Sequence, residues 1–320
     1  MKTFAEIRQS LARELEQMDA IIDDTLHSTS QLTNEITTHY MAAKGKQLRP
    51  VITLLSGKFF GGVTQKVLHA AGSIELLHNA SLIHDDVIDL AKNRRGINTI
   101  NSVWDNHVAV LVGDFFVSGA LQLAVKTGDP HVLNALATMG KDLAMSEINQ
   151  VDFAQRHQYD EQAYMDVIRG KTASLFECCV LAGGYACDAP EQPLEALRRF
   201  AELLGICFQI KDDTFDYFHD PEVGKPTGND LREGKVTLPL IYALRNAPDN
   251  IKQLLEKEQL GDDDIHTLVE FAKDAGGIDY AYTTMNQLRE KAAALLAPYA
   301  DNPVCSDFND IFLFVIDRKK

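Results

Sequence analysis

Apolar residues recur at every third or fourth position along nearly the whole chain, and this spacing restricts the fold more than any other feature. Ile7, Leu11, Leu15, Met18 and Ile22 form one such series near the start. Residues spaced in this way lie on one face of an α-helix, whereas a half-buried strand requires strict alternation. We find no convincing alternation with a period of two. The sequence therefore predicts an all-α protein.

Later segments share this spacing, and breaks rich in Gly, Pro and Asp separate several of them. Pro50 is expected in the first turn of a helix, where its missing N–H leaves no hydrogen bond unmade. The breaks are too short for domain linkers, so we expect a single domain over residues 1–320, with roughly a dozen helices around a common core. The predicted helices lie near residues 28–43, 50–60, 64–91, 101–127, 131–156, 160–187, 191–219, 235–246, 249–258, 262–274, 277–297 and 304–317.

Charge and composition exclude several classes of protein. The chain has 46 acidic and 31 basic residues, a net charge of −15, which argues against a surface that binds nucleic-acid phosphates. Residues 1–17 are amphipathic and charged, so we expect no signal peptide, and we expect no segment to match the ~18–20 apolar residues of a membrane span. A soluble, cytoplasmic protein follows. The five cysteines lack CxxC spacing and are expected to be reduced core residues.

Two clusters of three aspartates follow strongly apolar helical segments with the same internal spacing. They are Asp85, Asp86 and Asp89, and Asp212, Asp213 and Asp216. On a helix each trio gathers on one face within about one turn. A single cluster could be an ordinary solvated face, but the repetition favours a shared function. Carboxylates this close repel one another unless a cation binds, and oxygen ligands without Cys or His favour Mg²⁺, which commonly bridges carboxylates to phosphates.

Basic residues near both clusters support a phosphate ligand. Each alone is an ordinary surface charge, but together they bracket the two clusters and indicate a set of side chains that contacts phosphate oxygens directly. The set comprises Lys46 and Arg49 in GKQLRP, Arg94 and Arg95 in RRG, Lys171 in RGKTASLFE, Lys211 beside the second cluster, and Lys225 and Lys235 in GKPTGNDLREGK.

Several motifs between about residues 40 and 245 occur in a fixed order. They are GKQLRP, HDDVID, RRG, GKT and KDDTFDYFHDPEVGKPTGNDLREGKVTLPL. In this order the chain resembles the trans-isoprenyl diphosphate synthases, and among them the long-chain polyprenyl diphosphate synthases. The resemblance implies an all-α isoprenoid synthase fold, with two DDxxD motifs on facing helices of a central substrate cavity. It also implies a homodimer that condenses isopentenyl diphosphate head to tail with an allylic diphosphate.

The resemblance also assigns roles to individual residues. Asp85, Asp86, Asp89, Asp212, Asp213 and Asp216 would hold about three Mg²⁺ ions on the allylic diphosphate, which Arg94, Lys171, Gln209, Lys225 and Lys235 would also contact. Lys46, Arg49, His78 and Arg95 would bind isopentenyl diphosphate, and Thr172 would help to steady the carbocation. Metal ions stabilise the charge that develops as the carbon–oxygen bond breaks, so no nucleophilic side chain is required.

Product length is predicted from the residues one turn before the first cluster. Ala80 and Ser81 lie on roughly the same helix face as Asp85, about 6 Å below the predicted metals, where a growing chain would press. Farnesyl-producing relatives carry a bulky aromatic residue near this floor. Ala80 leaves it open, which predicts a product longer than farnesyl diphosphate, of the kind used in quinone side chains. The other interpretation is that a small residue here only permits close helix packing.

Three other functions remain open at this point. One is a short-chain farnesyl or geranylgeranyl diphosphate synthase, and the second is a terpene cyclase or head-to-head condensing enzyme, although a cyclase usually has a degenerate second motif. The third is a non-catalytic helical subunit, which would be expected to lack some of the aspartates. Gln47 and Ile97 stand where many relatives have a basic residue, so isopentenyl diphosphate is expected to be bound either more weakly or in a different arrangement here.

Overall fold

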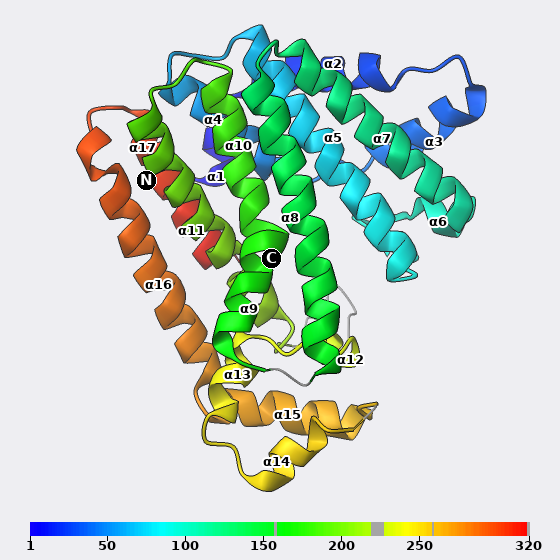
Figure 1. Cartoon of the computed structure of the whole chain (residues 1–320), viewed down its shortest axis with the longest axis vertical. Coiled ribbons are helices and arrows are strands. Elements are labelled where there is room, and N and C mark those ends of the chain that lie inside the picture. The colour runs from blue at the N-terminus through cyan, green and yellow to red at the C-terminus, as the bar shows by residue number, and fades with distance from the viewer. Residues whose placement is uncertain (157–158, 219–226, 258, 319–320) are drawn as a thin grey trace. The chain divides into compact units, whose positions relative to one another are not determined.

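The computed structural model describes residues 1–156, 159–218, 227–257 and 259–318, and within these ranges it is almost entirely helical (Figure 1). The all-α prediction is confirmed. The described residues contain one pair of strands, β1 (Asn93–Arg94) and β2 (Ile97–Asn98), which are antiparallel. The sequence analysis missed this hairpin because it is so short. Its turn places Arg95 at φ 52° and Gly96 at φ 81°, the pair of positive φ angles typical of two-residue hairpin loops.

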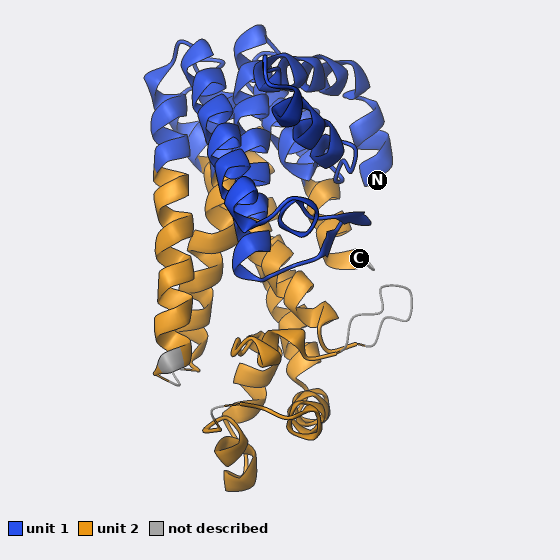
Figure 2. Ribbon diagram, turned by 90° about the vertical axis from the view of Figure 1, so that its right-hand side faces the viewer, with its two compact units in different colours: residues 1–137, 178–195, 301–308 blue, residues 138–177, 196–300, 309–320 orange. Residues whose placement is uncertain are grey.

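The chain forms two compact units, coloured separately in Figure 2. Unit 1 contains residues 1–137, 178–195 and 301–308, and unit 2 contains residues 138–177, 196–300 and 309–320. The expectation of one domain over residues 1–320 stays a prediction.

Unit 1 is organised around α5 (Gln65–Ile88) and α7 (Asn106–Lys126), which lie side by side in Figure 1. Both are apolar on more than one face, so each can bury residues against several neighbours. Around them lie α1 (Phe4–Gln9), α2 (Ala12–Leu26), α3 (Gln31–Met41), α4 (Leu48–Phe59), α6 (Ile100–Val103) and the first part of α8 (Pro130–Gln155). Pro50 lies in the first turn of α4, as predicted.

Unit 2 contains the rest of α8 and all or part of each later helix. They are α9 (Glu161–Ile168), the π-helix η1 (Arg169–Ala173), α10 (Ser174–Tyr185), α11 (Glu191–Phe215), α12 (Asn229–Arg232), α13 (Leu238–Leu244), α14 (Asp249–Leu254), α15 (Asp262–Asp274), α16 (Gly277–Leu296), η2 (Ala297–Tyr299) and α17 (Val304–Asp317). The first residues of α11 and α17, and most of α10, belong to unit 1. One core cluster of this unit packs Leu240 of α13 against Leu268 and Ala272 of α15.

Several predicted helices differ from those observed in their boundaries. The helix predicted over 160–187 contains η1, and the one predicted over 101–127 is broken before residue 106. The second break has a local cause, because the Asp105 carboxylate accepts a hydrogen bond from the Val108 N–H and so caps α7.

All five cysteines carry free thiols, as expected, and four of them are buried.

One helix differs from the prediction about membrane spans. Within the described ranges α7 is long and apolar enough to cross a membrane, which we had expected of no segment. In its most apolar stretch 44% of the residues are buried inside the protein, and one such helix is weak evidence for a membrane span.

Candidate active site

The first aspartate cluster lies at the carboxyl end of α5. Asp85 and Asp86 are in its last turn, and Asp89 is the capping residue. The negative end of the helix dipole disfavours carboxylates here. Arg94 on β1 compensates in part, since its Nε donates to Asp86 Oδ1 at 2.7 Å. Burial nevertheless raises the pKa of Asp86. A cation would therefore stabilise this end of α5.

Three arginines of unit 1 act electrostatically on the partly buried side chain of His78. Burial lowers the pKa of His78 well below its usual value, and Arg49, Arg95 and Arg94 lower it further. The imidazole is therefore neutral beside the guanidinium groups at neutral pH. Gly45 makes room for one of them, because a Cβ at this position would lie 2.9 Å from Arg95 Cζ. This concentration of positive charge suits a diphosphate.

Glu75, which the sequence analysis missed, lies on α5 one turn before Asn79. It is buried, and burial raises its pKa although Arg49 and Arg95 act in the opposite direction. Glu75, Asn79 and Arg95 line one pocket of unit 1. Sequence spacing gave no signal for Glu75, because a single Glu within an apolar helix has no partner that can be identified without the fold.

Gln47, the departure noted in the sequence, joins two N-terminal helices to the loop before α4. Its Oε1 accepts from Arg8 Nη2 at 2.9 Å, and its Nε2 donates to Asp19 Oδ1 at 3.0 Å. Asp19 also pairs with Lys44 at 2.7 Å. The neutral amide thus brings the Arg8 guanidinium close to the pocket that Gln47 and Arg95 line.

In unit 2, Lys171 and Thr172 lie in the π-helix η1. Extra-wide turns of this kind occur frequently at functional sites. Gly170 allows η1 to approach α8, because a Cβ there would lie 1.9 Å from Ser146 Oγ. Lys171 Nζ is 2.6 Å from Glu147 Oε1 and 3.3 Å from Gln150 Oε1, both on α8. The close approach therefore fixes the position of the Lys171 ammonium group.

The three carboxylates of the second cluster have different surroundings on and just after α11. Asp212 Oδ1 accepts from Arg318 Nη2 at 2.7 Å. Asp213 is buried, and its oxygens accept from Tyr164 Oη at 2.6 Å and from Gln209 Nε2 at 2.7 Å. Burial, followed by the charge of Asp230, raises its pKa well above the usual value.

Asp216, by contrast, holds the start of α12. Its two oxygens accept from the backbone N–H groups of Asn229 at 2.9 Å and of Asp230 at 3.0 Å. A helix N-terminus favours such a carboxylate. The role of Asp216 as a metal ligand stays a prediction.

Asp230 is a further candidate that the sequence analysis missed. Burial, followed by the charge of Asp216, raises its pKa to about 6. It lies in NDLREGK, between Lys225 and Lys235, but no repeated spacing marked it.

Three lysines of the predicted basic set remain to be placed. Lys225 lies outside the described residues. Lys235 Nζ is 2.6 Å from Glu233 Oε2, and Lys211, which we had counted among the basic set, instead donates to Tyr282 Oη at 2.7 Å.

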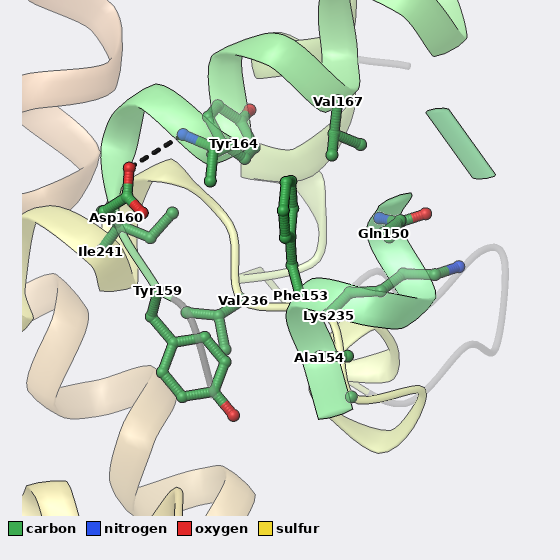
Figure 3. A pocket seen from close by; sticks show the side chains of 12 residues that line it. Gln150, Phe153, Ala154, Tyr159, Asp160, Tyr164, Val167, Lys235, Val236 and Ile241 are labelled. Carbon is green, nitrogen blue, oxygen red and sulfur yellow. Dashed lines mark hydrogen bonds between the residues drawn. The ribbon is translucent and has the colours of Figure 1, made fainter. Parts of the chain in front are cut away.

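Lys235 also lines the pocket drawn in Figure 3. This hollow of about 50 Å³, partly open to solvent, lies between α8, α9 and the segment 234–241. Gln150 and Phe153 contribute from α8 and Tyr164 from α9. The pocket therefore combines aromatic walls with the ammonium group of a residue that we assigned to diphosphate.

The structure gives the surroundings of the predicted metal ligands and chain-length residues, and the roles of these residues stay predictions. The carboxylate-only clusters have the chemistry that Mg²⁺ prefers, but among the described residues no three Asp, Glu, His or Cys side chains already form a metal site. Convergence of the two clusters on one cavity stays a prediction, since they belong to different units. Ala80 is 1% exposed, and Ser81 Oγ donates to the His78 carbonyl at 2.9 Å. Their roles in chain length also stay predictions.

Comparison with known proteins gives consistent matches. The polyprenyl synthetase family model matches residues 30–272. The chain is 34% identical to an all-trans-nonaprenyl-diphosphate synthase (geranyl-diphosphate specific) of Rhodobacter capsulatus, over 91% of this chain and 90% of that one. It is 34% identical to a short chain isoprenyl diphosphate synthase of Methanocaldococcus jannaschii, over 81% and 79%. The structure matches a decaprenyl diphosphate synthase from Rhodobacter capsulatus with a TM-score of 0.92 and 34% identity, covering 99% of each chain.

Proposed function

Because this chain belongs to the polyprenyl synthetase family, we propose that it condenses isopentenyl diphosphate head to tail with an allylic diphosphate, to a trans product longer than farnesyl diphosphate. The observation that carries this proposal is the presence of both complete aspartate clusters together with the arginine-rich surroundings of His78. The relatives named as nonaprenyl and decaprenyl diphosphate synthases support the longer product.

The aspartates would hold Mg²⁺, and about three ions are part of this proposal. When bound, Mg²⁺ neutralises the leaving diphosphate. Asp86 accepts from Arg94, Asp212 accepts from Arg318, and Asp213 accepts from Tyr164 and Gln209, so a metal ion at these carboxylates would compete with protein donors. Asp85 is a candidate beside Asp86 in unit 1. Asp89 and Asp216 remain in the proposed set.

The other side chains bind and orient the two substrates. Lys46, Arg49, His78 and Arg95 would hold isopentenyl diphosphate, with neutral His78 donating a hydrogen bond rather than a charge. Arg94, Lys171, Gln209, Lys225 and Lys235 would contact the allylic diphosphate. Lys171 and Arg94 are each paired with a carboxylate, and the diphosphate would compete with those carboxylates for them. The Thr172 hydroxyl would face the allylic carbons.

A product assay tests this function. The protein is incubated with Mg²⁺, labelled isopentenyl diphosphate and either geranyl or farnesyl diphosphate, and chain length is measured by chromatography after dephosphorylation. We expect products longer than farnesyl, and a loss of several orders of magnitude in the Asp85→Ala/Asp86→Ala variant. A cyclase would give no longer diphosphate, and a non-catalytic subunit would give no turnover; either result contradicts the proposal.

We also propose that the protein is a cytoplasmic homodimer. α7 carries four exposed apolar residues, Val110, Leu111, Leu121 and Val125, at 42%, 55%, 44% and 63% exposure. On an ideal helix they lie within an arc of about 100°. The exposed Asp114 shares this arc, so the four residues form an apolar patch that a charged residue interrupts. A two-fold dimer would bury the same patch on both copies.

A further inference from the structure

A chain of three short hydrogen bonds crosses the interior of unit 2 and ends at Thr172. Tyr164 on α9 donates from its hydroxyl to Asp213 Oδ2 at 2.6 Å. Gln209 Nε2 donates to Asp213 Oδ1 at 2.7 Å. Thr172 Oγ1 donates to Gln209 Oε1 at 2.6 Å. Tyr164, Asp213 and Thr172 are each less than 9% exposed, so water competes little for these groups.

The donors and acceptors give each bond a direction. Both Asp213 oxygens accept, one from Tyr164 and one from Gln209, so the Gln209 amide turns its NH₂ group toward Asp213. Its carbonyl oxygen then faces Thr172, whose hydroxyl has one proton to donate. Tyr164 occupies Oδ2, which leaves Oδ1 for the amide. With its proton committed to Gln209, the Thr172 oxygen can present only lone pairs to a neighbouring group.

We propose that Asp213 and Tyr164 are positioning residues that set the polarity of the Thr172 hydroxyl, so that its lone pairs face the allylic cation. This inference rests on the proposed function and deepens it. Asp213 then acts through Gln209 and Thr172, and Asp212 is the metal ligand of this adjacent pair. Two neighbouring aspartates of one motif therefore have different tasks.

The electrostatic reason is the sign of the charge that develops during the reaction. A hydroxyl oxygen directed at a carbocation stabilises it, whereas a hydroxyl proton directed at it destabilises it. Such fixed dipoles act strongly in a site that excludes water, because no solvent reorganises to screen them. The buried hydrogen-bond chain holds the dipole in place before the reaction begins.

Asp213→Asn is expected to reverse the chain. The carbonyl oxygen of the introduced amide would accept from Tyr164, and its NH₂ group would face Gln209, whose own amide then turns over. Gln209 would then donate to the Thr172 oxygen. The Thr172 hydroxyl group would therefore point its proton toward the substrate. We expect the single-turnover rate of the first condensation to fall about 10- to 100-fold, with KM values and the Mn²⁺ dissociation constant within about twofold of wild type.

A double-mutant cycle with Thr172→Val separates this role from a structural one. Without the hydroxyl there is no polarity to set, so Asp213→Asn should cause little further loss in the Thr172→Val background. Tyr164→Phe should give a smaller loss than Asp213→Asn and should also depend on Thr172. Tyr217→Phe is the matched control, since Tyr217 is a buried tyrosine of the same unit that pairs with Thr237 and should leave the rate unchanged.

Two results would overturn the inference. Weaker Mn²⁺ binding by Asp213→Asn, similar to that of Asp212→Asn, would make Asp213 a metal ligand. Equal losses from Asp213→Asn with and without the Thr172 hydroxyl would make its role independent of Thr172. A wild-type protein that makes no prenyl product would instead reject the proposed function, which is a separate outcome.

Discussion

The second aspartate cluster shows how far identical spacing can conceal different roles. Asp212 pairs with an arginine, Asp213 is buried and accepts two hydrogen bonds, and Asp216 caps α12. The spacing identified all three as candidates because it places them on one helix face. It could not distinguish them, since each environment is created by residues distant in the sequence, among them Tyr164, Asn229 and Arg318.

His78 gives a prediction for stability against pH. Its folded-state pKa is depressed, while the unfolded chain takes up a proton near pH 6.5. The folded state therefore binds fewer protons, so the contribution of His78 to stability is complete above about pH 6.5 and is lost as the pH falls. His78→Gln should flatten the loss of unfolding free energy between about pH 6.5 and 5, measured by urea titration.

The matched control for this prediction is His107→Gln, a change at an exposed histidine of α7. It should preserve the wild-type dependence on pH. A His78→Gln variant whose stability falls as steeply as that of the wild type would contradict the argument.

Ala80 gives a prediction for product length. If the chain grows toward this buried position, Ala80→Tyr should block it and yield shorter products by chromatography. Overpacking at such a site destabilises by about 1–3 kcal/mol, so thermal unfolding is measured in parallel. Ala80→Ser, which adds little volume, should keep the wild-type length. A folded Ala80→Tyr enzyme with unaltered product would mean that Ala80 only serves helix packing.

At the scale of elements, irregular segments position the candidate groups more than the long helices do. The π-helix η1 carries Lys171 and Thr172, the β1–β2 hairpin carries Arg94 and Arg95, and Gly45 and Gly170 provide the space that these segments need. Periodicity predicted the long helices correctly but missed η1 and the hairpin. Both are too short to produce a periodic signal, and tertiary contacts stabilise them.

The end of α17 gives a prediction for metal binding. Arg318 donates to Asp212 Oδ1, and its guanidinium group lies 4.0 Å from the centre of the Phe208 ring. A divalent ion at Asp212 is repelled by this cation and must compete with it. Arg318→Gln should therefore bind Mn²⁺ about three- to tenfold more tightly, measured by calorimetry without substrate.

Arg245→Gln is the control for charge removal, because Arg245 is paired with Glu161 instead. It should leave the Mn²⁺ affinity unaltered. Unchanged or weaker binding by Arg318→Gln would show that Arg318 does not compete with the metal.

At the scale of the whole molecule, the exposed face of α7 predicts the oligomeric state. Val125→Glu/Leu111→Glu places two charges on this face and should convert a dimer into a monomer, measured by light scattering after gel filtration. Leu32→Glu, a change at an exposed leucine of α3, should leave the dimer intact. A wild-type monomer, or a dimer that tolerates both charges, would contradict the proposal.

The sequence by itself determined the helical class and the two aspartate clusters, because periodicity and charge spacing are local properties of the chain, and its ordered motifs indicated the reaction class through their resemblance to a known family. Only the tertiary structure decided which aspartate is buried, which pairs with Arg318 and which caps a helix. It also revealed further candidate residues, Glu75 in unit 1 and Tyr164 and Asp230 in unit 2. The physical reason is that burial and hydrogen-bond partners come from segments far apart in sequence, and these surroundings set the charge, orientation and accessibility of each group.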